Sequence, residues 1–286
     1  MQIERREEKK TLFVTFLWEL DRRRLPRLRP WSVYRERFDS LARESKESGA
    51  DLLVFTDDEH AITSALRWGV TYVKVSRDSF FEWQRLEQVM KAIARKLPFS
   101  NPELSCTEYV CLQNCKFEAM ERALSLWPHD TACWIDAGLR KEALRPLRTR
   151  WRGTGLRLAL YQDLLRPEWF VTETPGSSVM GTAWGGDRDS LVWLSRCTRD
   201  IQSELLERGR CANDQQLLTL VAQRHADRVV LFPLYRMDFW LLGGGRWSQI
   251  LDVLDDEKRQ QPERGLHDVV LLCLIAVLIC LAIRKL

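Results

Sequence analysis

One carboxylate, Asp136, occupies the most informative position of the sequence. It follows the short apolar run 131–135 and precedes Ala137 and Gly138. Loops at the carboxyl ends of buried strands form the binding crevice of an open α/β sheet, so an acid at a strand exit is a candidate ligand for a metal ion or a substrate. The alternative interpretation is that Asp136 only starts a turn or caps the next helix.

A second pair of acids follows another apolar run. Asp57 and Asp58 come directly after the predicted strand 51–56. They are further candidates for ligand contact, although acids are common in turns at strand ends.

The elements that must position these acids alternate between strand and helix. β-branched and aromatic runs predict strands at 11–20, 51–56, 70–75, 131–135, 156–161 and 229–233. Helical spacing of apolar residues predicts helices at 31–45, 59–68, 80–96, 108–126 and 187–207, with another beginning near 213. Because strand, helix and strand in succession imply parallel crossovers, we expect a layered α/β domain with a mixed, mostly parallel sheet flanked by helices.

Charge and cysteine content narrow the class of protein. The chain has 44 Lys and Arg against 40 Asp and Glu, and a net charge of +4 gives no reason to expect nucleic acid. The run 22–29 concentrates five arginines, which suits either an anionic ligand or a solvated loop. The eight cysteines fit no common zinc spacing, so we expect reduced thiols.

The carboxyl-terminal end predicts a membrane anchor. Residues 269–283 contain no polar side chain apart from cysteine, whereas a buried core helix, the alternative, would normally show a polar stripe. We therefore expect a main domain over 1–250, a polar linker over 251–265 and a transmembrane anchor over 266–286. The first ten residues lack an apolar core, so we expect no secretory signal, and a single carboxyl-terminal span leaves the main domain in the cytosol.

Several segments, taken in order, resemble the HtrL/YibB-like family of glycosyltransferases, whose fold is similar to that of the GT-A nucleotide-sugar transferases. The resemblance covers about 11–240 and rests on Leu53–Asp57, Lys116–Met120, Trp134–Gly138, and the later glycine-rich and Asp-Gln elements. It implies transfer of a sugar, as in the hexosyltransferase class, from a nucleotide-sugar donor to a hydroxyl of a glycan or protein acceptor.

In GT-A enzymes, an Asp-x-Asp motif at a strand end holds a divalent cation, Mn²⁺ or Mg²⁺, that stabilises the negative charge on the departing diphosphate. The resemblance places this motif at Trp134-Ile135-Asp136, so the first carboxylate is missing. Asp136 is then the expected metal ligand by itself.

The resemblance also implies the roles of other residues. The donor would contact Asp57, Lys116, Trp134 and Asp136; the acceptor would contact Trp184, Gly185 and Gly186; and Asp214 would be the base of an inverting reaction.

Each of these residues also has a simpler interpretation. Lys116 suits a solvated helix surface, and the two glycines suit a flexible lead-in to a helix capped by Asp187. Asn213 or Asp214 suits an N-cap.

The sequence thus predicts a membrane-anchored glycosyltransferase. The main alternative is a membrane-tethered binding protein that keeps the fold without catalysis. A nucleotidyltransferase or phosphohydrolase ranks last, because such enzymes need two or three clustered acids and the best strand end offers one.

Overall fold

The computed structural model describes residues 11–20, 30–94, 106–138, 155–160, 171–172 and 179–233. All of them belong to a compact unit, Met1–Asp255, and Asp256–Leu286 form a second unit. The arginine-rich run 22–29, the predicted linker and the predicted anchor lie outside the described residues. Within the described ranges, no helix combines the length and apolar character that a membrane span requires.

The described residues form one seven-stranded sheet of order β3-β2-β1-β4-β6-β5-β7. Strand β6 pairs antiparallel with both of its neighbours, and the other strand pairs are parallel. The strands are β1 (Leu12–Leu17), β2 (Asp51–Thr56), β3 (Thr71–Lys74), β4 (Thr131–Ile135), β5 (Leu156–Leu160), β6 (Val179–Asp187) and β7 (Val229–Pro233). The predicted α/β class with a mixed, mostly parallel sheet is confirmed.

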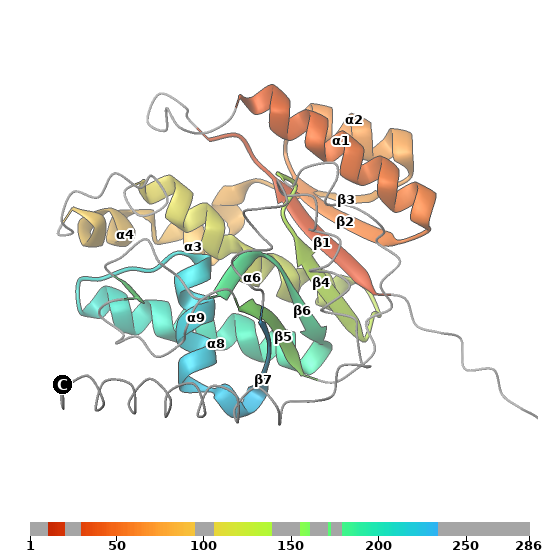
Figure 1. Cartoon of the computed structure of the whole chain (residues 1–286). Coiled ribbons are helices and arrows are strands. Elements are labelled where there is room, and N and C mark those ends of the chain that lie inside the picture. The colour runs from red at the N-terminus through yellow and green to blue at the C-terminus, as the bar shows by residue number, and fades with distance from the viewer. Residues whose placement is uncertain are drawn as a thin grey trace, which may run out of the picture. The chain divides into compact units, whose positions relative to one another are not determined.

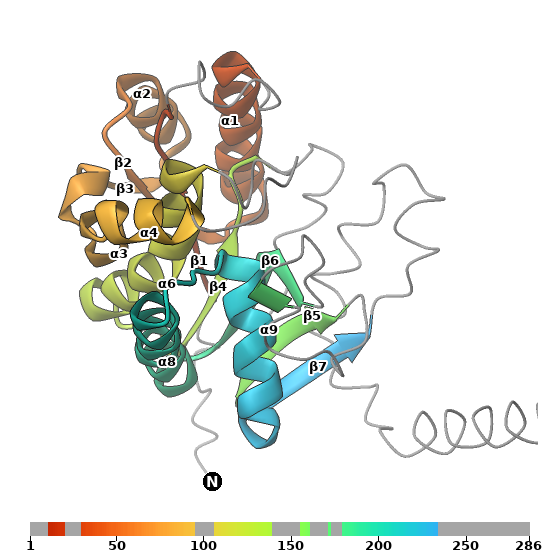
Figure 2. The ribbon, with the colours of Figure 1, turned by 90° about the vertical axis from the view of Figure 1, so that its left-hand side faces the viewer.

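Helices cover both faces of the sheet. Helices α1 and α2 lie together against β1–β3, whereas α6 and α8 lie on the opposite side, with α9 beside α8 and β6 (Figures 1 and 2). The helices are α1 (Trp31–Ser48), α2 (Glu59–Trp68), α3 (Phe81–Gln84), α4 (Leu86–Ile93), α6 (Thr107–Leu126), α8 (Arg188–Glu207) and α9 (Asp214–Arg224). Short 3-10 turns, η2 (Arg77–Ser79) and η4 (Ala226–Arg228), precede α3 and β7.

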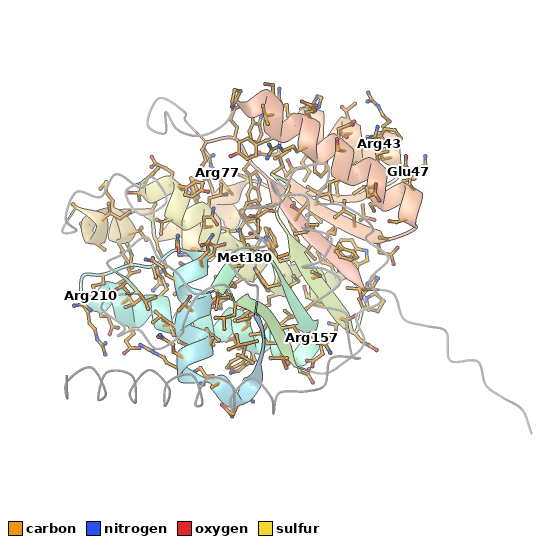
Figure 3. All side chains as sticks on the ribbon, viewed as in Figure 1. Arg43, Glu47, Arg77, Arg157, Met180 and Arg210 are labelled. Atoms are coloured by element: carbon orange, nitrogen blue, oxygen red, sulfur yellow. The ribbon has the colours of Figure 1, made fainter. Side chains whose placement is uncertain are left out.

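Strand β1 shows why the sheet is apolar on both faces. Phe13 and Leu17 belong to the core cluster under α1 and α2, and Leu12 and Val14 belong to the cluster under α6 and α8. Successive side chains of a strand point to opposite faces, so a strand covered on both sides reads as a continuous apolar run. The polar faces of the helices point outward, as the Arg43–Glu47 ion pair on α1 illustrates (Figure 3).

Two predictions about local structure were wrong. The predicted helix 80–96 is divided at Arg85 into α3 and α4. The glycine-rich segment around Gly185 and Gly186, expected to be a flexible lead-in to a helix, lies inside strand β6. Its glycines are needed for close strand packing, because a Cβ on Gly185 would lie 2.5 Å from the carbonyl oxygen of Ala132 on the neighbouring strand.

Candidate functional site

The site lies where β1, β2 and β4 end, at the carboxyl edge of the sheet. These three strands run parallel, whereas β6 runs the other way and begins at this edge. The backbone N–H of Asp136, just beyond β4, donates to the carbonyl oxygen of Thr182 at 3.0 Å. Met180, one residue into β6, helps to find this edge in Figure 3. Asp136 therefore stands at a strand exit, as the sequence predicted.

The ammonium group of Lys116, from the middle of α6, lies beside Asp136. Its Nζ is 2.9 Å from Oδ1 of Asp136 and 2.6 Å from Oδ2 of Asp214, the first residue of α9. It also donates to the carbonyl oxygen of Gly181 at 3.2 Å. Lysine has three N–H donors, and three oxygens meet them here. We call Lys116, Asp136 and Asp214 the ionic triad.

Burial within the triad is uneven. The side chain of Lys116 is 3% exposed and that of Asp214 is 1% exposed, whereas the side chain of Asp136 is 27% exposed. Lys116 therefore does not lie on a solvated helix face, so that interpretation was wrong. Direct contact with a donor phosphate does not suit a side chain that is buried and paired in this way. Asp136 is the member of the triad that a ligand can reach.

The charges of the triad are strongly coupled. Burial by itself lowers the pKa of Lys116, but the attraction of Asp136 and Asp214 outweighs it and the net pKa is raised. Burial raises the pKa of Asp214, the charge of Asp136 adds to this, and Lys116 opposes it. Both directions follow from two carboxylates sharing one ammonium, which holds the lysine charged and makes the second carboxylate harder to ionise.

The Asp136 carboxylate is held in one orientation. Its Oδ1 faces Lys116 and also accepts a 2.7 Å hydrogen bond from the indole N–H of Trp134. Among the described residues, none donates to its Oδ2. Two donors thus hold Oδ1, whereas Oδ2 of this partly exposed carboxylate has no donor in the described part of the chain and is the oxygen that a ligand would contact.

Asp214 does not occupy the position expected of a catalytic base. A carboxylate that is 1% exposed and paired with Lys116 does not face an acceptor hydroxyl in this structure. Its neighbour Asn213 is the N-cap of α9 and forms a capping box with Gln216, as the simpler interpretation allowed. The structure therefore gives Asp214 a positioning role, in which it holds Lys116 under Asp136.

The expected acceptor residues are not at this edge. Gly185 and Gly186 pair with Cys133 and Ala132, near the start of β4 and so toward the opposite edge. Trp184 is fully buried, and its ring stacks on Trp134 with centroids 6.2 Å apart. Trp184 therefore belongs to the core beneath the site, where it packs against Trp134, and its ring is not accessible to a sugar.

Asp57 fits its expected position better. It is exposed directly after β2, at the same edge as Asp136 and two strands away from β4. Its neighbour Asp58 caps α2 by accepting from the N–H of Ala61, and it also binds Arg35 at 2.6 Å. Asp57 thus remains a candidate contact for a ligand, and Asp58 has a structural role.

The described residues do not fit the divalent cation that the resemblance implies. They contain no group of three or more His, Cys, Asp and Glu side chains placed to hold a metal ion. The neighbouring carboxylate of Asp214 is buried, and the ammonium group of Lys116 lies against the carboxylate of Asp136. A divalent cation would meet one free carboxylate oxygen beside a positive charge, whereas Mn²⁺ and Mg²⁺ need several oxygen ligands.

Two pockets that described residues line lie elsewhere. A hollow of about 490 Å³ lies at the amino ends of β1–β3, between Trp68 and Trp127. Volume alone makes it a ligand-sized pocket. We favour the carboxyl edge as the chemical site because a buried ion network orients a partly exposed carboxylate there.

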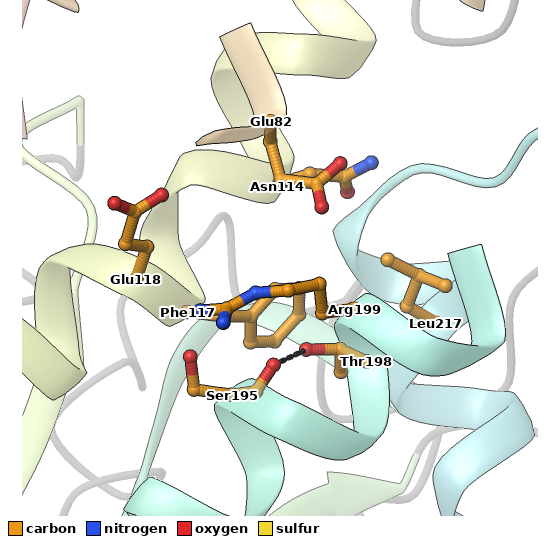
Figure 4. Close-up of a pocket in the computed structure, with 8 residues that line it drawn as sticks. All are labelled: Glu82, Asn114, Phe117, Glu118, Ser195, Thr198, Arg199 and Leu217. Atoms are coloured by element: carbon orange, nitrogen blue, oxygen red, sulfur yellow. Dashed lines mark hydrogen bonds between the residues drawn. The ribbon is translucent and has the colours of Figure 1, made fainter. Parts of the chain in front are cut away.

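The second pocket is small and lies between α6 and α8, bordered by α3 and α9 (Figure 4). Glu82 and Asn114 lie on the same side of it in this view, and both are buried. The Nδ2 amide group of Asn114 donates to the carbonyl oxygen of Ala212. Among the described residues, Oδ1 of Asn114 and Oε2 of Glu82 have no hydrogen-bond partner. Burial of the Glu82 carboxyl favours its protonated form.

This arrangement predicts a pH-dependent stability. Burial raises the pKa of Glu82 to about 6 from 4.5, against the opposing charge of Arg85. Because the folded state binds this proton more tightly, its contribution is complete below pH 4.5 and is lost as the pH rises through about 6. We expect Glu82→Gln to be more stable than wild type by about 2 kcal/mol at pH 8 and equal to it at pH 4. Urea unfolding of both proteins across this range measures the difference, and a difference independent of pH would contradict the prediction.

Comparison with protein-family models gives no match, and comparison with curated proteins gives none either.

Proposed function

We propose that this protein is a GT-A-like glycosyltransferase that moves a sugar from a nucleotide-sugar donor to a hydroxyl of a glycan or protein acceptor. In this proposal residues 266–286 anchor it in a membrane and the main domain faces the cytosol. The observation that carries the proposal is the oriented, partly exposed carboxylate of Asp136 at the carboxyl edge of the sheet. A mixed, mostly parallel sheet with helices on both faces is also the fold that the resemblance implies.

Asp136 would act by orienting the donor. A carboxylate oxygen that is already held in place accepts hydrogen bonds from sugar or ribose hydroxyls with little further loss of freedom, and such charge-assisted bonds are the stronger ones. Fixing the donor in one pose lowers the barrier to attack by the acceptor hydroxyl. Asp57, exposed at the same edge, would contact the nucleotide part of the same ligand in this proposal.

A thermal-shift screen of the full chain against nucleotide sugars, with and without Mn²⁺, tests the proposal. We expect one donor to stabilise the protein, by about 2.7 kcal/mol at a hundred times its Kd, because it binds only the folded state. Asp136→Asn should abolish this stabilisation. Asp189→Asn, which makes the same change on an exposed residue of α8, should leave it intact.

A catalytically inactive binding protein of the same fold is the second candidate. The burial of Asp214 and Lys116 favours it, since neither side chain is available to substrates. Release of nucleoside diphosphate from the bound donor, lost in Asp136→Asn, would favour the enzyme. Failure of every nucleotide sugar to bind, with or without Mn²⁺, would favour the binding protein.

A further inference from the structure

The surroundings of the Lys116 ammonium have the character of a metal site. Two carboxylate oxygens and one backbone carbonyl oxygen lie within 3.2 Å of its Nζ. Carboxylates and carbonyls are the ligands that hard divalent cations prefer. The ring of Trp134, with its centroid 5.7 Å from Nζ, adds an aromatic face that also attracts positive charge.

The backbone is adapted to this arrangement. A Cβ on Gly181 would lie 2.2 Å from Oδ2 of Asp214. Only glycine at this position therefore lets the Asp214 carboxylate and the carbonyl oxygen of residue 181 both approach the ammonium group of Lys116. Asp214 in turn comes from the first turn of α9, and Lys116 from the centre of α6. Three separate elements therefore converge on one positive charge.

We infer that the ammonium group of Lys116 is the permanent cation of this site and occupies the place that a divalent metal ion would otherwise take. The inference deepens the proposed function and rests on it in one respect: a nucleotide-sugar donor would bind without a divalent ion. The lysine is tethered and sealed, so it balances the carboxylates and orients Asp136 without touching the ligand.

The first test measures Mn²⁺ binding to the full wild-type chain by electron paramagnetic resonance. We expect no Mn²⁺ bound at Asp136 at millimolar concentration. Binding that Asp136→Asn abolishes would overturn the inference. Binding that Asp136→Asn leaves unchanged places the ion elsewhere and supports it.

The second test removes the internal cation. Lys116→Ala leaves two carboxylates and a carbonyl oxygen around an emptied position, so we expect this variant to gain Mn²⁺ binding by at least tenfold over wild type. A folded Lys116→Ala that takes up no Mn²⁺ would overturn the inference. If this variant does not fold in EDTA, we expect it to refold in Mn²⁺. Mn²⁺ binding to the wild-type chain then still decides whether the inference holds.

The donor measurement separates the two proposals. A donor that binds wild type equally in EDTA and in Mn²⁺ supports both the transferase and the internal cation. A donor that needs Mn²⁺ at Asp136 keeps the transferase and overturns the internal cation. If no donor binds, the transferase proposal fails, and Mn²⁺ binding to wild type and to Lys116→Ala decides the inference independently.

Discussion

Replacing Lys116 by methionine is expected to lower the free energy of unfolding by about 3–5 kcal/mol. Methionine fills a similar volume but removes the charge, which leaves the carboxylate of Asp214 buried at 1% exposure without its cationic partner. Removing one member of a buried ion pair costs more than the pair contributes, because the remaining charge stays desolvated. Urea unfolding monitored by tryptophan fluorescence measures the loss.

The double variant Lys116→Met/Asp214→Leu is the matched control. It removes both buried charges, so we expect most of the lost stability to return. The coupling energy between the two positions then follows from the double-mutant cycle. A single variant Lys116→Met within 1 kcal/mol of wild type would show that the ion pair is not formed as described, and the role given to Lys116 would fall with it.

The sequence predicted most of the fold because its signals are local. Helix α2, for example, was predicted at its observed bounds, since Asp58 supplies an N-cap and Gly69, with a φ of 70°, supplies the left-handed residue that ends it. Strand β4 was predicted from its apolar run, and the position of Asp136 at its exit followed from chain order alone.

The partners of Lys116 were not predictable from local signals. Asp214 is 98 residues away along the chain, and the pair forms only when α6 and α9 meet against β6. One signal was present: Lys116 lies directly between the apolar residues Cys115 and Phe117, and all three are buried in the structure. A lone lysine inside such a run indicates a buried ion pair.

The glycines of β6 misled the prediction for a related reason. A glycine-rich segment suits a loop and also suits a strand whose neighbours approach closely, and the choice depends on contacts from distant residues. Gly185 faces the backbone of β4, Gly186 faces the carbonyl oxygen of Gly155, and Gly181 faces Asp214. None of these partners can be identified from the segment itself, so the acceptor role assigned to it depended on the wrong local structure.

Substituting alanine for Gly181 is expected to destabilise the protein by about 3 kcal/mol, toward the upper end of the cost of overpacking. The added methyl group would lie 2.2 Å from Oδ2 of Asp214, and this oxygen is held at 2.6 Å from Lys116. The carboxylate must move to make room, and its movement weakens the ion pair. Chemical denaturation measures the loss. The same change in a Lys116→Met/Asp214→Ala background should cost much less, because the obstructing carboxylate is gone and the close contact that remains, with Cγ of Gln215 at 2.9 Å, is to a side chain that can shift. An equal loss in both backgrounds would mean that Gly181 is required for the strand alone, and that its approach to the triad contributes nothing.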